Sequence, residues 1–274
     1  TLDSILAQTF EDFELIISDN ASTDKTQEIC QKYAQKDRRI IYYRNAENLG
    51  AAPNYNRTFK LSSGEYFKWA ACDDLCAPKY LEKCVEVLDQ NPNVVLCYPR
   101  QILVDQYGEE IRKESMFEVQ FSTPHERFES YHDLWYKTGS ISANAVFGLI
   151  RSTALKETSL IGSFIYGEVH LITELVLQGD FYEVPEYLFF FRFHPKTSRQ
   201  LRKKSGNLGM HNWFDVKNSE QKIIFPNWNL LFQQIKTINK IEIDWKERVY
   251  CYKSILKWFS WKWKKLIGEL FKSI

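Results

Sequence analysis

Two adjacent aspartates, Asp73 and Asp74, stand between two cysteines in the stretch WAACDDLCAPKYLE, where an apolar run gives way to a helical pattern. Neighbouring carboxylates repel each other, so a cation, a hydrogen-bond donor or solvent must compensate their charges. The pair therefore indicates a divalent metal site, a site for a hydroxyl-rich ligand, or a helix cap, since Asp74 could cap a helix that begins near Pro78.

A third carboxylate, Asp19, directly follows the apolar stretch FELIIS, which has the length of a β-strand. Taken alone, Asp19 could be a turn residue whose side chain bonds its own backbone. In an α/β sheet, however, ligands bind at the carboxyl ends of the strands. Asp19 and the Asp73–Asp74 pair each follow an apolar run, and three acids at one sheet edge favour a binding site.

Charged residues in the second half of the chain are candidates for a base and for anion contacts. Glu168 lies in the first turn of a helix predicted over 166–179, where the helix dipole stabilises a carboxylate. A basic stretch follows the apolar run FYEVPEYLFFF and contains Arg192, His194, Lys196 and Arg199. A histidine in a basic loop that closes the domain is a candidate for binding an anion or a metal.

The elements that must position these residues alternate along the chain. Short apolar runs predict strands at 13–18, 39–45, 65–71, 94–105, 143–151 and from 181 onward. Helical periodicity and capping signals predict helices over 22–35, 53–64, 77–92, 125–137 and 166–179. The alternation predicts an α/β fold with a doubly wound, mostly parallel sheet flanked by helices, and a helical extension at the C-terminus.

The composition excludes several classes of protein. Of the 274 residues, 44% are hydrophobic and 15% aromatic, so the chain can bury a sizeable core. The net charge of +1 gives no general attraction to nucleic acid. No apolar run reaches the roughly 20 residues that a membrane-spanning helix needs. The six scattered cysteines, with no signal peptide, predict reduced thiols in a cytoplasmic protein, and the lone C-x3-C is a weak zinc signal.

Four motifs carry a resemblance to a known family, namely QTFEDFELIISDNASTDKT, NLGAAPNYN, WAACDD and GEVHLITELVLQGDFYEVPEYLFFFRFHPKTS, in that order. Together they resemble family 2 glycosyltransferases, inverting enzymes of the GT-A fold, over residues 1–199. The resemblance implies a nucleotide-sugar glycosyltransferase domain at 1–199. Beyond that domain we expect a basic loop or linker at 200–240 and an amphipathic helical segment at 241–274.

The resemblance implies a role for each carboxylate on the donor side. Asp19 matches the aspartate that contacts the donor nucleobase, and Asp73 matches a carboxylate that binds the donor ribose. Asp74 matches the carboxylate that binds a divalent metal, Mg2+ or Mn2+, which bridges the donor diphosphate, and His194 could assist it.

The resemblance also implies residues for the phosphates and the acceptor. Arg192 matches an R-x-H element that approaches the diphosphate, and Lys196 and Arg199 would add donors to the same phosphates. Glu168 falls where the family usually has aspartate, so it resembles the base that removes the proton of the acceptor hydroxyl.

One part of the family pattern is absent from the sequence. A first strand and a P-x-Y-N turn, which help to hold the nucleotide, do not precede the predicted helix TLDSILAQTF. We therefore expect this chain to be a fragment whose natural form begins earlier and whose donor site lacks one wall.

The expected function is that of a metal-dependent, inverting glycosyltransferase. It would move a sugar from a UDP- or dTDP-linked donor to a hydroxyl of a glycan or lipid-linked acceptor, in the synthesis of a bacterial cell-surface polysaccharide. Two alternatives stay open. One is a non-catalytic nucleotide-binding or scaffolding protein of the same fold, and the other is a nucleotidyltransferase, for which the chain lacks a Gly-rich phosphate loop.

The last third of the chain lies beyond the resemblance. RKKSGNLGMHNW predicts a mobile basic loop, either a lid over the donor or a linker. From Ile241 onward the sequence predicts one or two helices with lysines beside an apolar stripe of Tyr252, Ile255, Leu256, Phe259, Trp263, Leu266, Ile267 and Leu270. Over 252–274 this helix either lies in a membrane interface, at the inner face of the membrane, or packs its stripe on the catalytic domain.

Overall fold

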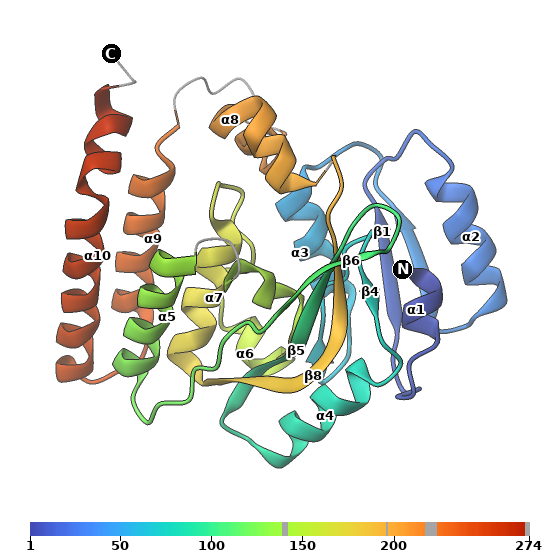
Figure 1. Cartoon of the computed structure of the whole chain (residues 1–274), viewed down its shortest axis with the longest axis horizontal. Helices are drawn as coiled ribbons and strands as arrows, with labels where there is room; N and C mark the ends of the chain where they lie inside the picture. Colours follow the sequence, from blue (N-terminus) through green and yellow to red (C-terminus); the bar gives the residue numbers. More distant parts are fainter. Residues whose placement is uncertain (139–141, 196, 217–223, 272–274) are drawn as a thin grey trace.

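The computed structural model describes residues 1–138, 142–195, 197–216 and 224–271. Figure 1 shows strands in the middle of the molecule with helices on both sides of them. The N-terminal and C-terminal helices lie at opposite ends of the view. The α/β class predicted from the alternation of strands and helices is confirmed.

The first two strands form a small parallel sheet. Strand β1 (Leu15–Asp19) pairs with β2 (Ile40–Arg44), and the last pair of this register joins Asp19 to Arg44. Helix α2 (Thr26–Lys36) connects the two strands, because parallel neighbours need a crossover. Helix α3 (Ala51–Leu61) packs on β1, and the short helix α1 (Leu2–Leu6) packs near the second sheet.

The second sheet has a mixed arrangement of strands. Its order is β3 (Tyr66–Phe67), β7 (Leu149–Arg151), β5 (Val94–Val104), β8 (Asp180–Arg192) and β4 (Leu75–Cys76), with β6 (Glu110–Glu114) pairing off this path with β5. Only the β5–β8 pair is parallel among these, and the other pairs are antiparallel. The prediction of a mostly parallel sheet is therefore wrong for this sheet.

A short connection explains one of the antiparallel pairs, β5 with β6. Strands β5 and β6 are joined by a tight turn in which the Asp105 carboxylate accepts the N–H groups of Tyr107 and Glu109. Gly108 has a φ of 97° in this turn, a conformation that favours glycine. A turn this short returns the chain antiparallel. The strand predicted at 143–151 is present only in part. Its first residues form a 3-10 helix, η1 (Ser142–Phe147), and its last three form the short strand β7.

Two helices cover opposite faces of β5. Cys97 belongs to the apolar cluster under α4 (Tyr80–Gln90), whereas Leu96 and Tyr98 belong to the main core around α7 (Gly167–Gln178). Alternate residues of a strand point to opposite faces, which places one helix on each side. Almost every residue of α7 is buried, since α5 (Pro124–Thr138) and α6 (Ser152–Lys156) also pack on it.

The segment predicted as a basic loop is helical in the structure. Helix α8 (Ser198–Phe214) includes it, with non-helical dihedral angles at Gly206. Met210, His211 and Phe214 are buried at helical spacing, so an apolar face holds this helix against the domain. Figure 1 shows α8 above α3. The loop prediction for this segment was wrong because the three buried residues are spread among many polar ones.

The chain ends in an antiparallel helical hairpin of α9 (Pro226–Lys240) and α10 (Trp245–Phe271), which stands beside α5 (Figure 1). Cys251, Ile255, Trp258 and Leu266 of α10 are buried in the main core. The alternative in which this helix packs on the catalytic domain therefore holds for its inner face. Leu256, Phe259, Trp263, Ile267 and Leu270 remain exposed on the outer face. Within the described ranges, no helix combines the length and apolar character needed to cross a bilayer.

Candidate functional site

The two adjacent aspartates occupy different environments between β3 and β4. Asp74 points inward and is 5% exposed. Its Oδ1 accepts the backbone N–H of Arg192 at 2.9 Å, while its Oδ2 is buried without a hydrogen-bond partner. The Asp73 side chain is more exposed, and its Oδ2 lies 2.7 Å from Nε2 of His194. The turn thus holds one sheltered carboxylate and one paired carboxylate.

Burial raises the pKa of Asp74 to about 7, and the nearby charge of Asp73 acts in the same direction. The hydrogen bond from Arg192 and the charges of Lys68 and Arg192 oppose this shift without cancelling it. A buried acceptor oxygen without a donor is costly, and a bound cation would compensate it.

The end of β8 fastens this turn in place. Strand β4, directly after the aspartates, pairs with β8 through Leu75 and Phe190. The guanidinium of Arg192 donates to the backbone carbonyl oxygens of Asp73 at 3.0 Å, Asp105 at 3.1 Å and Gln106 at 3.3 Å. Arg192 therefore ties the aspartate turn to the β5–β6 turn, and its contact with donor phosphates stays a prediction.

The structure brings together four of the residues singled out in the sequence, Asp73, Asp74, Arg192 and His194. Asp19 lies at the end of β1, on the other sheet, so the expectation that the three aspartates share one sheet edge is wrong. Lys196 lies outside the described residues, and Arg199 falls in the first turn of α8, where its side chain is not described. Their predicted roles on the donor remain predictions.

Asp19 is held as a carboxylate by three donors. Its Oδ1 accepts the N–H of Ser22 at 2.8 Å, and its Oδ2 accepts the Tyr42 hydroxyl at 2.7 Å and Arg44 Nη1 at 2.6 Å. Burial alone raises the pKa of Asp19, but the hydrogen bonds from Ser22 and Tyr42 and the charge of Arg44 together lower it below its ordinary value. A fixed negative charge thus stands at the edge of the β1–β2 sheet.

Beside Asp19 lies a network of four asparagines, Asn20, Asn45, Asn48 and Asn54, which we call the asparagine cluster. Asn45 donates to the side-chain oxygens of Asn20 and Asn54, and Asn20 donates to Asn48. Asn54 belongs to α3 and bonds Ser18 of β1. Asn20, Asn48 and Asn54 lie within the sequence motifs and Asn45 lies between two of them, but no role was assigned to any of the four. Amides with both donors and acceptors suit recognition of a planar polar base.

Helix α3 connects this edge with the aspartate turn. Its Tyr55 is next to Asn54, and its pKa is raised by burial and by the nearby charges of Cys72, Asp73 and Asp74. Trp69, just before the turn, donates to the Tyr55 carbonyl at 2.8 Å. Gly50 precedes α3 with a φ of 87°, and a Cβ there would lie 2.7 Å from the Phe214 carbonyl oxygen of α8. The end of α8 therefore lies beside Gly50, whose backbone bonds Asn20 and Asn48 of the asparagine cluster.

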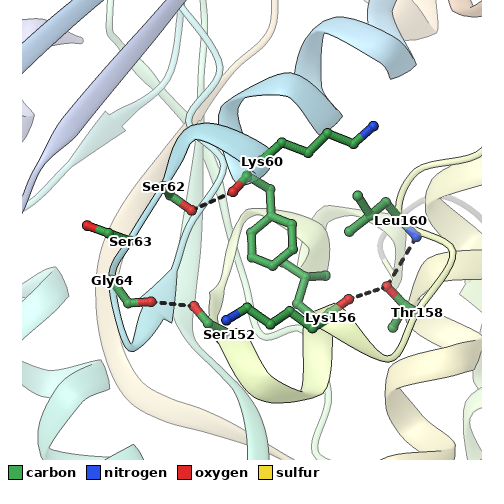
Figure 2. Close-up of a pocket in the computed structure, with 10 residues that line it drawn as sticks. Lys60, Ser62, Ser63, Gly64, Ser152, Lys156, Thr158 and Leu160 are labelled. Carbon is green, nitrogen blue, oxygen red and sulfur yellow. Dashed lines mark hydrogen bonds between the residues drawn. The ribbon is translucent and has the colours of Figure 1, made fainter.

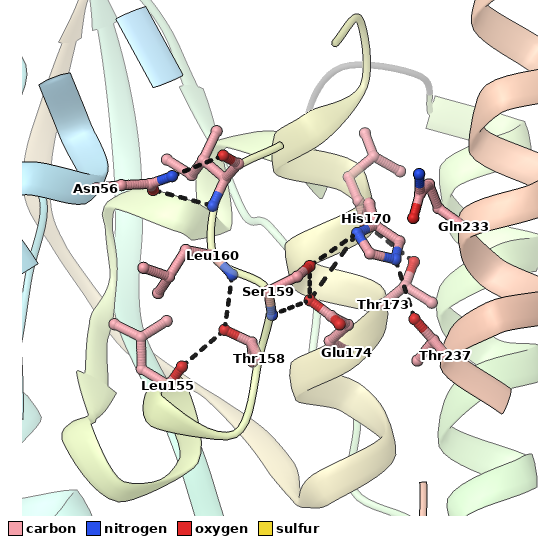
Figure 3. Close-up of polar contacts among 12 residues, drawn as sticks. Asn56, Leu155, Thr158, Ser159, Leu160, His170, Thr173, Glu174, Gln233 and Thr237 are labelled. Carbon is pink, nitrogen blue, oxygen red and sulfur yellow. Dashed lines mark hydrogen bonds and ion pairs between the residues drawn. The ribbon is translucent and has the colours of Figure 1, made fainter. Parts of the chain in front are cut away.

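Glu168 lies in the first turn of α7 and is half-buried. The helix begins after Tyr166, whose φ of 77° is unusual for a residue with a side chain. The preceding loop is fastened on two sides, as Figure 3 shows. Asn56 of α3 exchanges two hydrogen bonds with the backbone of Ile161, and Glu174 accepts the Ser159 hydroxyl and N–H.

Among the described residues, no group of three or more His, Cys, Asp or Glu side chains could hold a metal ion by itself. Mg2+ and Mn2+ need fewer protein ligands when a substrate diphosphate and water complete the shell. The buried Asp74 oxygen without a donor, beside the Asp73–His194 pair, fits such a cation. These residues would hold it through Asp74, with Asp73 and His194 adjacent.

A pocket in Figure 2 lies elsewhere, lined by Lys60, Ser62, Gly64, Ser152, Lys156 and Thr158 among others. Ser62 to Gly64 precede β3, whereas the aspartates follow it. The hydroxyls of Ser152 and Thr158 donate to the carbonyls of Gly64 and Leu155. Because these donors serve the fold, this pocket is not the candidate site.

Comparison with known proteins gives a family match and a set of relatives. The model of the family described as glycosyl transferase family 2 matches residues 1–157. Glycosyltransferase GlyA of Streptococcus pneumoniae serotype 4 is 28% identical over 237 residues, which cover 86% of this chain and 28% of that protein. The chain spans about a third of the length of the curated relatives it matches first.

Solved structures share the fold at low sequence identity. TarS of S. aureus, residues 1–349, has a TM-score of 0.64 and 14% identity, covering 94% of this chain and 66% of that chain. A second structure of TarS contains UDP-GlcNAc. The mannosyltransferase PcManGT from Pyrobaculum calidifontis, in complex with GDP-Man and Mn2+, has a TM-score of 0.53 and 14% identity, covering 99% of this chain and 74% of that chain.

Proposed function

The chain belongs to glycosyltransferase family 2, and we propose that it transfers a sugar from a nucleoside diphosphate donor to a hydroxyl group with inversion. The donor diphosphate would meet a divalent cation, Mg2+ or Mn2+, at the aspartate turn. The acceptor hydroxyl would approach from the side of α7.

One observation carries this proposal. A buried carboxylate oxygen of Asp74 has no hydrogen-bond donor, and it stands next to the Asp73–His194 pair where β3 has ended. A metal ion bound there would neutralise charge on the departing diphosphate. Binding of Mn2+ together with GDP-Man in PcManGT supports this reading, since that protein shares the fold.

The β1–β2 edge would bind the nucleoside. Asp19 and Arg44 present a fixed ion pair, and the asparagine cluster adds amide donors and acceptors beside it. The Asp73 side chain is exposed enough for its carboxylate to accept a hydrogen bond from a ribose hydroxyl. We propose UDP or dTDP as the nucleotide of the donor.

Glu168 would act as the base. Its carboxylate would accept the proton of the acceptor hydroxyl while the hydroxyl oxygen attacks the anomeric carbon and the bond to the diphosphate breaks. Attack from the opposite face inverts the configuration in one displacement, so no covalent enzyme intermediate forms. Arg192 and the basic residues Lys196 and Arg199 that follow it would add donors for the diphosphate.

The proposed setting is the cytoplasm, with a glycan or lipid-linked acceptor of a bacterial surface polysaccharide pathway. All six cysteines are free thiols in the structure, and four of them are buried. Free thiols are usual in a reducing compartment. They support the setting and leave the acceptor to be identified.

Calorimetric titration of UDP and dTDP tests the proposal. We expect binding in the presence of Mn2+ that is lost with EDTA and weakened at least about tenfold by Asp74→Asn, because one metal ligand is neutralised. Asp12→Asn is the matched control, since Asp12 is an exposed aspartate in another part of the domain. It should bind as the unaltered protein does.

Each outcome has a distinct meaning. If the nucleotide binds equally well with Mn2+ and with EDTA, and equally well to the Asp74→Asn variant, the assignment of the metal site is refuted. If the nucleotide binds with metal, the same protein is then incubated with the UDP- or dTDP-linked sugar. Failure to transfer the sugar to any hydroxyl acceptor or to water would favour a nucleotide-binding protein over an enzyme. No binding by the folded chain would refute the proposed donor site.

A further inference from the structure

The outer face of α10 carries a continuous line of exposed apolar side chains. Val249, Leu256, Trp263 and Leu270 recur every seven residues, and Phe259 and Ile267 stand beside them. These six residues, which we call the outer stripe, run along most of a 27-residue helix, which is about 40 Å long. Leu256 is 66% exposed and Trp263 is 46% exposed.

The outer stripe continues onto the neighbouring helix. Phe259 contacts Trp228 of α9 edge to face, with ring centroids 6.5 Å apart. Trp228 stacks on Phe232, which is 60% exposed. The exposed apolar surface therefore spans both helices of the hairpin, whereas isolated exposed apolar residues would need no explanation.

The charges of α10 are sorted between its two sides. Its two acidic residues, Glu247 and Glu269, are both bonded into the fold, where Glu247 accepts from His125 and Glu269 accepts from Asn227 and Trp228 at the start of α9. Lys246, Lys253, Lys264 and Lys265 are exposed. The outward charge of this helix is therefore positive.

Three of the lysines lie against exposed aromatic rings. The ammonium groups of Lys246, Lys253 and Lys264 stand 5.8, 4.5 and 5.6 Å from the ring centroids of Trp245, Tyr250 and Trp263. Aromatic rings and lysines combine apolar bodies with polar ends, which suits the boundary between hydrocarbon and water.

We propose that the outer stripe and its lysines dock this protein on an anionic lipid bilayer, with α10 lying in the plane of the interface. An amphipathic helix with aromatic residues on one face and lysines beside it binds such a surface through apolar burial and attraction to acidic headgroups. A second copy of this chain would bring the same cations against each other, which disfavours self-pairing. This inference does not depend on the transfer reaction, because docking needs neither donor nor acceptor.

Vesicle sedimentation tests the proposal with the full chain. We expect the protein to sediment with phosphatidylcholine vesicles that contain phosphatidylglycerol and to bind pure phosphatidylcholine vesicles at least tenfold more weakly. The double variant Leu256→Glu/Trp263→Glu should lose at least nine tenths of the binding. Ile111→Glu is the matched control, since Ile111 is a half-exposed apolar residue on β6.

A second variant separates charge from apolar burial. Lys253→Gln/Lys264→Gln should weaken binding to the acidic vesicles and leave the stripe intact. Circular dichroism should show that all variants keep the helical content of the parent. Failure of the parent to bind acidic vesicles, equal binding to neutral vesicles, or full binding by the Leu256→Glu/Trp263→Glu variant would overturn the proposal. A dimer in solution that this variant converts to monomer would assign the stripe to a second copy instead.

Discussion

At the scale of single residues, the Asp19 carboxylate illustrates how the fold stabilises a charge. We predict that Asp19→Asn lowers the free energy of unfolding by about 1–3 kcal/mol at neutral pH, because Arg44 loses its charged partner. The fold lowers the pKa of Asp19 below 3.8, so this stabilisation is fully present above that value and is lost as the pH falls through the folded pKa. Urea unfolding across this pH range measures it.

The control for this prediction is Asp12→Asn, which removes the same charge from an exposed position. It should change stability little at any pH. If Asp19→Asn lowers the free energy of unfolding by the same amount from neutral to strongly acidic pH, the packing and hydrogen bonds of this side chain, and not its charge, stabilise the fold.

The sequence predicts some of the site residues and misses others for a physical reason. The family resemblance assigned Asp73, Asp74, Arg192 and His194 to the ribose, the metal and the diphosphate of one donor, and the structure brings these four residues together. The argument from strand ends also grouped Asp19 with the aspartate pair, and that grouping was wrong because β1 and β3 belong to different sheets. Arg44 and the asparagine cluster were missed, since an arginine or asparagine after a strand is common and acquires a role only through its partners. Those partners come from β1, β2 and α3, which the sequence does not place against one another.

At the scale of elements, the loop that precedes α7 depends on Asn56. It contains Leu160 with a φ of 60° and ends at Tyr166 with a φ of 77°, conformations that cost energy unless contacts enforce them. We predict that Asn56→Ala raises amide hydrogen exchange of residues 158–166 at least about tenfold, because both hydrogen bonds to Ile161 are lost.

Mass spectrometry of the exchanged peptides measures this effect. Asn91→Ala serves as the control, since Asn91 bonds the Val87 carbonyl at the end of α4, in another part of the fold. It should leave the loop peptides unchanged. Unchanged exchange in Asn56→Ala would mean that the Glu174 contacts alone hold the loop.

Helices and strands were easier to predict than the direction of the strands. The helices α2, α3, α4 and α7 carry capping and periodicity signals, and each lies close to its predicted range. Strand direction depends on which strands become neighbours, and β7 and β4 are too short to show their pairing in sequence. Helix α8 was missed because only its few buried residues mark an apolar face.

At the scale of the whole molecule, one apolar core joins the part of the domain that contains both sheets to the C-terminal hairpin. The main core contains Ala52 of α3, Leu96 of β5 and Leu171 of α7, and it continues to Ile238 of α9 and Trp258 of α10. The hairpin is therefore part of the folded domain. Its inner face stabilises the domain, which leaves its outer face available for binding.

A pair of tryptophans in the same helix tests this division of roles. Trp258 is fully buried and stacks on Trp135 of α5 with ring centroids 6.2 Å apart, whereas Trp263 is 46% exposed. We predict that Trp258→Ala lowers the free energy of unfolding by about 3–5 kcal/mol. Trp263→Ala should change it by about 0.5 kcal/mol or less. Urea unfolding followed by far-ultraviolet circular dichroism measures both. In the contrary outcome, Trp258→Ala leaves the main transition at its original urea concentration and adds a separate transition at lower urea. The hairpin would then unfold independently, and its packing on the shared core would not be what stabilises the domain.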